Sequence, residues 1–362
     1  MMLHAILLGA LSLGLASFAM QDHDADSSSP KEPLEFELVR PEGMADDQSG
    51  PVLIALPPGG QDRGMVEAGL QRYWRDEAIR LGWTVVSPVA PDGQRLHGDN
   101  LPRVFELIDQ IEKRFSVEGG RVHLAGVSNG GRTAMELALA QPERFASLSL
   151  LPGMPVELDL DRLERLTSLP MAMYVGGDDA GWLAPMESMR ARLESLGSPP
   201  ARFTVFEGEG HTPKSLSGKT LFHTLESFRV HSALHDFHDA ASKADGARYF
   251  AHFADGAIYM GTDASERWTV EAFRAFAEPY FSKGRGWTYV ASERHVYVSD
   301  DGQSAWFDEL LDNSSYGVTR GTGVFVRSGD RWRMAQYHLT IPMPNDLAKT
   351  FVEMIRKDAA AR

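Results

Sequence analysis

The stretch Gly126-Val127-Ser128-Asn129-Gly130 decides how this chain is interpreted, because it has the form G-x-S-x-G at the junction of two patterns. A strand-like run covers residues 121–125, and a helix-like run covers residues 133–140. A serine hydroxyl is a weak nucleophile at neutral pH, so catalysis needs a sharp strand-to-helix turn that presents it to a histidine. Ser128 is therefore the candidate nucleophile, and the flanking glycines relieve the crowding of the turn.

Around this turn, apolar strand-like runs alternate with amphipathic helical stretches from residue 34 to about residue 228. This alternation predicts an α/β fold with a doubly wound, mostly parallel sheet that has helices on both faces. The first run alternates, as an edge strand does, whereas the central runs are more continuously apolar. We expect strands at residues 36–39, 52–56, 84–90, 121–125, 145–150, 171–175 and 203–206.

A serine nucleophile in such a sheet needs an acid and then a histidine, each on a loop at the carboxyl end of a later strand. His211 lies in a loop after the last of these runs, and two adjacent aspartates follow the run at 171–175. His211 would accept the proton of Ser128, while one aspartate orients the imidazole. We favour Asp179, because such loops place the acid three residues after the glycine that ends the strand. Asp178 is the alternative acid; otherwise it would cap the next helix or face water.

The oxyanion of the tetrahedral intermediate needs two backbone N–H donors. One should come from Asn129, directly after the nucleophile. The other should come from the loop Pro57-Pro58-Gly59-Gly60-Gln61, in which the prolines have no N–H to donate. This leaves Gly59, Gly60 or Gln61 as the second donor.

Taken in order, VLIALPPGGQ, GVSNGG, GGDD and GEGHTP resemble an α/β-hydrolase of the esterase, feruloyl-esterase and polyhydroxyalkanoate-depolymerase type, over residues 33–230. The resemblance implies ester hydrolysis through an acyl-enzyme, with no cofactor and no metal. Related enzymes usually show His-Gly where this chain has Pro57-Pro58. The short connections leave little room for a large lid, so we expect an open site for a small-molecule or polymeric ester.

From about residue 231, helical stretches are followed by four alternating segments at 288–298, 304–312, 319–326 and 331–341, which predicts an α+β domain. Residues 236–276, 289–311 and 331–342 resemble the SnoaL-like group of the nuclear-transport-factor-2-like superfamily. The resemblance implies a cone-shaped domain that binds a ligand or drives dimerisation. We expect core and dimer contacts from Trp268, Trp287, Trp306, Tyr289 and Tyr337. Asp308, His295 and His338 also lie on strands, but no acid–base pair has a recognisable spacing there.

Composition narrows the function further. The chain has 362 residues, enough for two domains, and 50 acidic residues against 36 basic ones. A net charge of -14 without a basic block argues against a surface that tracks nucleic-acid phosphates. The absence of cysteine excludes disulfides, thiolate metal sites and a cysteine nucleophile.

The N-terminus predicts export. Residues 1–19 are apolar and end in small residues, as in a secretory signal peptide, and residues 20–32 form a polar linker. An uncleaved anchor is the alternative, since the first residues contain His4 in place of a lysine or arginine. We expect a hydrolase domain at 33–230, a SnoaL-like domain at 231–343, a helix or tail at 344–362, and no stable membrane insertion after cleavage.

The sequence therefore predicts an exported serine hydrolase of carboxylic esters, located in the periplasm or outside the cell, and possibly a homodimer through its C-terminal domain. Two alternatives remain open. The same three residues cleave amides in serine peptidases. The chain could also be a non-catalytic binder of small molecules that acts through the C-terminal domain.

Overall fold

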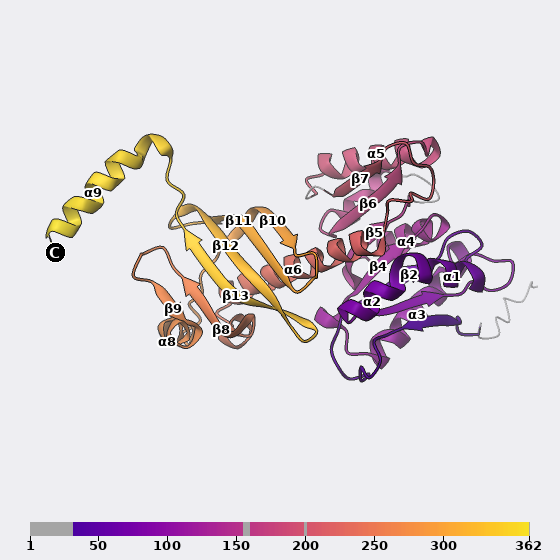
Figure 1. The fold of residues 1–362 in the computed structure, drawn as a ribbon, viewed down its shortest axis with the longest axis horizontal. Helices are drawn as coiled ribbons and strands as arrows, with labels where there is room; N and C mark the ends of the chain where they lie inside the picture. The colour runs from indigo at the N-terminus through magenta and orange to yellow at the C-terminus, as the bar shows by residue number, and fades with distance from the viewer. Residues whose placement is uncertain (1–31, 155–159, 199–200, 362) are drawn as a thin grey trace, which may run out of the picture. The chain divides into compact units, whose positions relative to one another are not determined.

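The computed structural model of this chain describes residues 32–154, 160–198 and 201–361. The predicted signal peptide and nearly all of the predicted linker lie outside the described residues. Within the described residues the chain forms two sheets, which lie in a first region (residues 33–229) and a second region (residues 230–361) (Figure 1). Among the described residues, no helix has the length and apolar character needed to cross a membrane.

The first sheet has the strand order β1-β3-β2-β4-β5-β6-β7, with β1 antiparallel to β3 and every other pair parallel. Its strands are β1 (Phe36–Val39), β2 (Val52–Leu56), β3 (Thr84–Pro88), β4 (Val122–Gly126), β5 (Phe145–Leu150), β6 (Met171–Gly176) and β7 (Arg202–Phe206). The predicted parallel sheet and its edge strand are confirmed. Strand β3 ends two residues earlier than predicted, because the N–H of Ala90 donates to the carbonyl of Gln61 instead of a neighbouring strand.

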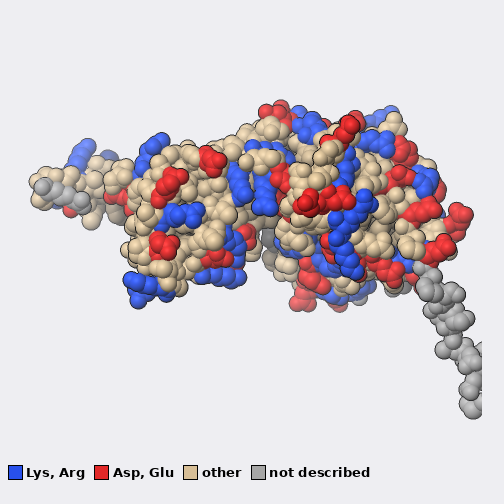
Figure 2. Space-filling model, turned by 90° about the horizontal axis from the view of Figure 1, so that it is seen from below, with Lys and Arg blue, Asp and Glu red and all other residues tan. Residues whose placement is uncertain are grey.

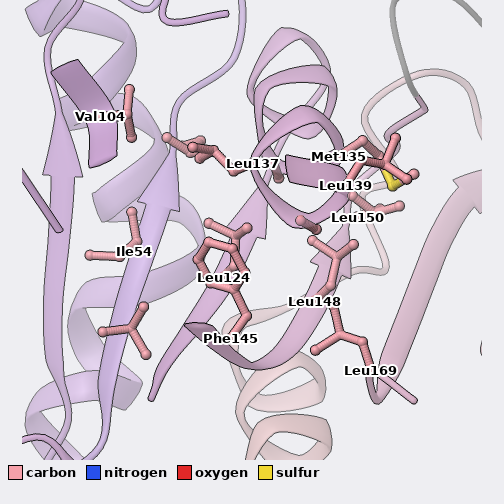
Figure 3. Close-up of a cluster of buried hydrophobic side chains, with 14 of the residues drawn as sticks. Ile54, Val104, Leu124, Met135, Leu137, Leu139, Phe145, Leu148, Leu150 and Leu169 are labelled. Atoms are coloured by element: carbon pink, nitrogen blue, oxygen red, sulfur yellow. The ribbon is translucent and has the colours of Figure 1, made fainter. Parts of the chain in front are cut away.

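Helices cover both faces of this sheet, because its strands are apolar on both sides. Along β2, Ile54 packs into one core and Leu53 into the other, and both are fully buried. The first core involves α3 (Leu101–Arg114), α4 (Asn129–Ala140) and α5 (Ala180–Ser195); the second involves α1 (Arg63–Gly69), α2 (Arg75–Leu81) and α6 (Gly218–Ser242). Figure 3 shows Leu137 and Met135 of α4 and Leu124 of β4 among the buried side chains of the first core. Each such buried side chain stabilises the fold by about 1.5–3 kcal/mol.

Helix α6 belongs to both regions. Its first half, with Phe222 and Leu225, packs against the first sheet, and its second half, with Leu234 and Phe237, packs into the core of the second region. Between these halves the carboxylate of Glu226 is fully buried. Its oxygens accept hydrogen bonds from the side chains of Trp83 (2.7 Å), Arg229 (2.9 Å), Arg327 (2.7 Å) and Trp332 (2.7 Å). These four donors satisfy a charge that would otherwise be costly to bury.

The second sheet has the order β10-β11-β12-β13-β8-β9. Its strands are β8 (Phe253–Met260), β9 (Arg267–Thr269), β10 (Val290–Val298), β11 (Ser304–Asn313), β12 (Gly317–Ser328) and β13 (Arg331–Thr340). Helices α7 (Gly246–Phe250) and α8 (Val270–Phe281) complete its core, and α9 (Ala348–Ala361) is exposed along its length. The four predicted segments are confirmed as β10 to β13, whereas β9 is too short to show an alternating pattern.

The aromatic residues of the second region divide between its core and its surface. Tyr337 is buried in the core, and Trp268, Trp287 and Tyr289 pack against that core. Trp306 is 48% exposed, so it does not belong to the core, and a dimer contact through it stays a prediction. It lies on β11 with its ring stacked on that of Tyr297 of β10, on the face opposite the buried side chains.

Candidate active site

The turn after β4 holds Ser128 in an unusual backbone conformation, with φ 56° and ψ −112°. A residue other than glycine in such a region costs about 1–3 kcal/mol, so the surrounding structure must enforce it. The N–H of Ser128 donates to the carbonyl of Pro152 (3.0 Å), and its carbonyl accepts from the N–H of Arg132 in α4 (3.1 Å). These two hydrogen bonds hold Ser128 at the start of α4.

The two glycines of the motif allow close approach of backbone segments. A Cβ added at Gly126 would lie 2.2 Å from the carbonyl oxygen of Gly130. A Cβ at Gly130 would lie 2.2 Å from the carbonyl oxygen of Leu56, at the end of β2. No side chain fits at either position, so the sharp turn depends on both glycines.

The structure brings Ser128, Asp179 and His211 together from the ends of β4, β6 and β7. Nε2 of His211 lies 2.8 Å from Oγ of Ser128, and Nδ1 lies 2.6 Å from Oδ2 of Asp179. Both distances are those of hydrogen bonds, with the serine hydroxyl donating to Nε2 and the Nδ1–H donating to the carboxylate. The His211 side chain is 43% exposed, and Ser128 is partly exposed.

Of the two adjacent aspartates, Asp179 is the one that contacts the histidine. Asp178 is exposed, and its backbone N–H donates to the carbonyl of Glu209 (2.9 Å), which ties the acid loop to the histidine loop. The suggestion that Asp178 caps the following helix is wrong. Helix α5 begins at Ala180, so Asp179 occupies the N-cap position and Asp178 faces water.

Of the three proposed donors from the loop after β2, two form no backbone hydrogen bond within the described residues. The N–H of Gln61 is used in a turn, since it donates to the carbonyl of Pro58 (2.9 Å). Gly59 and Gly60 remain as candidates. Asn129 is the first residue of α4, so its N–H has no carbonyl one turn earlier to bind. Its side-chain Nδ2 donates to the carbonyl of Gly59 (2.8 Å), which links the two sides of the predicted oxyanion hole.

The side chain of Gln61 anchors this loop, a role that the sequence did not reveal. It is fully buried: its Nε2 donates to the carbonyl of Pro57 and to Oγ1 of Thr133 (3.3 Å each), and its Oε1 accepts from the N–H of Leu96 (2.9 Å). The available signal was a polar residue directly after two glycines, but only the fold shows that it points inward against α4.

A second serine–histidine contact lies inside the first sheet. Nδ1 of His123 in β4 lies 2.7 Å from Oγ of Ser147 in β5, and both residues are buried. Burial, together with the nearby charge of Arg229, lowers the pKa of His123 to about 3. The imidazole is neutral at physiological pH and out of reach of a substrate, so this pair packs the sheet.

The second region also contains an acid and a base in contact, which the sequence analysis did not foresee. Nε2 of His238 in α6 lies 2.8 Å from Oε1 of Glu309 in β11, and Arg294 of β10 bonds the other carboxylate oxygen (2.7 Å). Burial alone would raise the pKa of the Glu309 carboxyl, but His238 and Arg294 outweigh it and hold that pKa below its ordinary value. The two residues are 71 positions apart, so no local spacing signals the pair.

The described residues contain no group of three or more His, Cys, Asp or Glu side chains arranged to hold a metal ion. Two cavities of about 840 and 750 Å³ share Ser168, Pro170, His231 and Arg294 in their walls, and neither is lined by Ser128, Asp179 or His211. Figure 2 shows acidic and basic side chains intermingled on one face of the molecule, without an extended basic surface there.

Two family models match this chain. Residues 104–273 match the model described as "Putative esterase", and residues 230–344 match the "SnoaL-like domain". The chain thus joins an esterase-type region to a SnoaL-like domain. The two matches overlap at residues 230–273, whose buried side chains lie in the core of the second region.

Individual proteins match this chain over only part of its length, and the solved structures among them share 20% identity or less. A 2-hydroxy-6-oxononadienedioate/2-hydroxy-6-oxononatrienedioate hydrolase of Paraburkholderia xenovorans (strain LB400) is 33% identical over 133 residues, which cover 32% of this chain and 43% of that protein. The match therefore spans less than half the length of this relative. Esterase PE8 shares 20% identity at a TM-score of 0.44, over 54% of this chain and 100% of its own. An NTF2-like protein of unknown function from Pseudomonas putida KT2440 shares 18% identity at a TM-score of 0.30, over 34% and 91%.

Proposed function

We propose that the protein is a serine hydrolase that cleaves carboxylic esters at Ser128 through an acyl-enzyme. The observation that carries the proposal is the continuous chain of hydrogen bonds from Oγ of Ser128, at the strand-to-helix turn after β4, through His211 to Asp179. The match of residues 104–273 to putative esterases supports ester cleavage.

In this mechanism, Oγ of Ser128 attacks the ester carbonyl carbon while Nε2 of His211 takes the hydroxyl proton. Asp179 holds the imidazole in the tautomer with hydrogen on Nδ1 and stabilises the imidazolium that forms. The N–H groups of Asn129 and of Gly59 or Gly60 donate to the oxyanion. The intermediate collapses as His211 returns the proton to the leaving alcohol, and water then hydrolyses the acyl-serine by the same route.

Ser128→Ala tests the proposal most directly. We expect turnover of short p-nitrophenyl esters to fall by about 10⁶ and fluorophosphonate labelling to disappear, since the alcohol that attacks is gone. Ser147→Ala is the matched control, because Ser147 also contacts a histidine but is buried in the sheet; it should keep turnover and labelling. Retained turnover and labelling in Ser128→Ala would refute the proposal. Parallel assays with peptide substrates separate an esterase from a peptidase.

We also propose that the protein is exported. The support is the apolar run at residues 1–19 followed by a polar linker. N-terminal sequencing of protein isolated from a producing cell should give a mature chain that starts near residue 20. A mature chain that still begins at Met1 or Met2 would contradict cleavage.

A further inference from the structure

Arg132 lies beside the proposed nucleophile. It lies in the first turn of α4, and its backbone N–H donates to the carbonyl of Ser128 (3.1 Å). The guanidinium carbon lies 5.1 Å from the ring centre of Trp182, and this ring lies 5.5 Å from the ring of His211. Trp182 thus contacts both the guanidinium of Arg132 and the imidazole of His211.

This guanidinium has no carboxylate partner among the described residues. Glu136, one helical turn further along α4, is the expected partner, but its carboxylate accepts from the N–H of Gly98 (3.1 Å). Nε of Arg132 is buried without a hydrogen-bond partner in the described part of the chain. A guanidinium offers five N–H donors in a planar arrangement that matches the two oxygens of a carboxylate.

Two further arginines border the loops of the site and likewise form no ion pair within the described residues. Arg72 donates to the carbonyl of Pro213 (2.9 Å), two residues after His211, and Arg95 donates to the carbonyl of Gly60 (3.4 Å). Carboxylates close to these loops have other partners: Glu209 accepts from Ser215, and Asp62 accepts from the N–H of Met65 (3.1 Å). The same acid and histidine loops carry the exposed carboxylates Asp178 and Glu207, so the site has charges of both signs, and Arg132 is the arginine that contacts Trp182 beside His211.

We propose that the site takes esters that carry a second, anionic carboxylate, and that Arg132 is the specificity-determining residue that binds this carboxylate. The inference rests on the proposed ester hydrolysis at Ser128. The guanidinium, held by its stack on Trp182, donates two parallel N–H···O bonds to the carboxylate and orients the ester carbonyl towards Ser128. A neutral ester leaves Arg132 without this partner.

Monoethyl adipate and diethyl adipate test the proposal, because they share one chain length and differ in the free carboxylate. We expect Arg132→Gln to lower kcat/KM for monoethyl adipate about 10- to 100-fold and to change diethyl adipate less than about twofold. Arg132→Lys should keep part of the monoester activity, since it retains the charge but not the planar fork. Arg190→Gln is the matched control: Arg190 also stacks on an aromatic ring (Phe203, 5.1 Å) but lies on α5, where its charge is paired with Glu194.

A second pair of substrates tells which side of the ester carries the carboxylate. 4-Acetoxybenzoate has the charge on its alcohol part, and phenyl acetate is its neutral counterpart. A loss in Arg132→Gln that is confined to either anionic ester supports the proposal and assigns the acyl or the alcohol side.

The failures of this inference and of the proposed function are distinguishable. Equal losses for charged and neutral esters would overturn the inference, because Arg132 would then act only through Trp182 on His211. Unchanged activity of Arg132→Gln on every ester would overturn it too, and so would fluorophosphonate labelling of Ser128 without turnover of any anionic ester. An enzyme that neither reacts with the probe nor cleaves any ester would overturn the proposed function as well.

Discussion

The two regions of this molecule each bring a histidine and a carboxylate into contact, and they use the contact differently. In the first region, His211 and Asp179 meet at 2.6 Å, the histidine side chain is 43% exposed, and a serine hydroxyl lies on its other side. In the second region, His238 and Glu309 meet at 2.8 Å, but the histidine side chain is only 9% exposed and the carboxylate is fully buried.

This comparison shows that the pair alone does not define a catalytic site. The first pair lies on loops at the ends of parallel strands, where the backbone is free to present side chains to a substrate. The second pair lies on a helix and in the middle of a strand, and Arg294 takes the remaining carboxylate oxygen. We therefore expect the first pair to control activity and the second pair to control stability.

The largest expected effect concerns the acid of the first pair. Asp179→Asn should lower kcat for short esters by about 10⁴, because the amide no longer holds the imidazole in the productive tautomer. Asp178→Asn is the control and should stay within about twofold, since that side chain faces water. Steady-state kinetics with p-nitrophenyl butyrate measure both; equal losses in the two variants would contradict the assignment of Asp179.

Removing the acid of the second pair should affect folding. Glu309→Gln leaves Arg294 without its buried counter-charge, and we expect the free energy of unfolding to fall by about 3–5 kcal/mol. At a temperature where the variant is folded, its kcat for esters should be unchanged. Glu293→Gln, which breaks the exposed contact with His295, should change stability by less than about 1 kcal/mol. Urea unfolding measures the stability of both variants. A loss of kcat in folded Glu309→Gln would show that the second region takes part in catalysis and would contradict the prediction.

A smaller effect is expected from the buried histidine of the first region. The pKa of His123 is about 3 in the folded protein and about 6.5 in an unfolded chain, so the unfolded state binds more protons between these values. The contribution of His123 to the free energy of unfolding is fully present above pH 6.5. It falls as the pH drops towards 3, by up to about 1.4 kcal/mol per pH unit.

His123→Gln should remove this slope from the unfolding free energy between pH 6.5 and pH 4.5. The exposed His295 provides the control, since His295→Gln should keep the slope of the wild type. Urea titrations at several pH values measure the difference, and identical slopes for wild type and His123→Gln would show that other groups cause the acid sensitivity.

Much of the first region could be predicted from sequence, because its signals are local. The parallel strands are largely apolar runs of five or six residues, and the glycines around Ser128 mark the turn directly. The order of the serine, the aspartates and His211 along the chain then indicated which loops would meet. In the second region, the strands β10 to β13 could also be predicted from sequence, whereas the three residues of β9 are too few to show a pattern.

What the sequence by itself determined is the type of each element and the residue types near the proposed site, since periodicity and turn chemistry act over a few neighbouring positions. The sequence already favoured Asp179 over Asp178, but only the tertiary structure showed which of them contacts His211, buried the side chain of Gln61 against α4, placed Arg132 on Trp182, and joined His238 to Glu309. Each of these depends on where a side chain points after segments up to 72 residues apart have packed, and packing is a property of the whole fold.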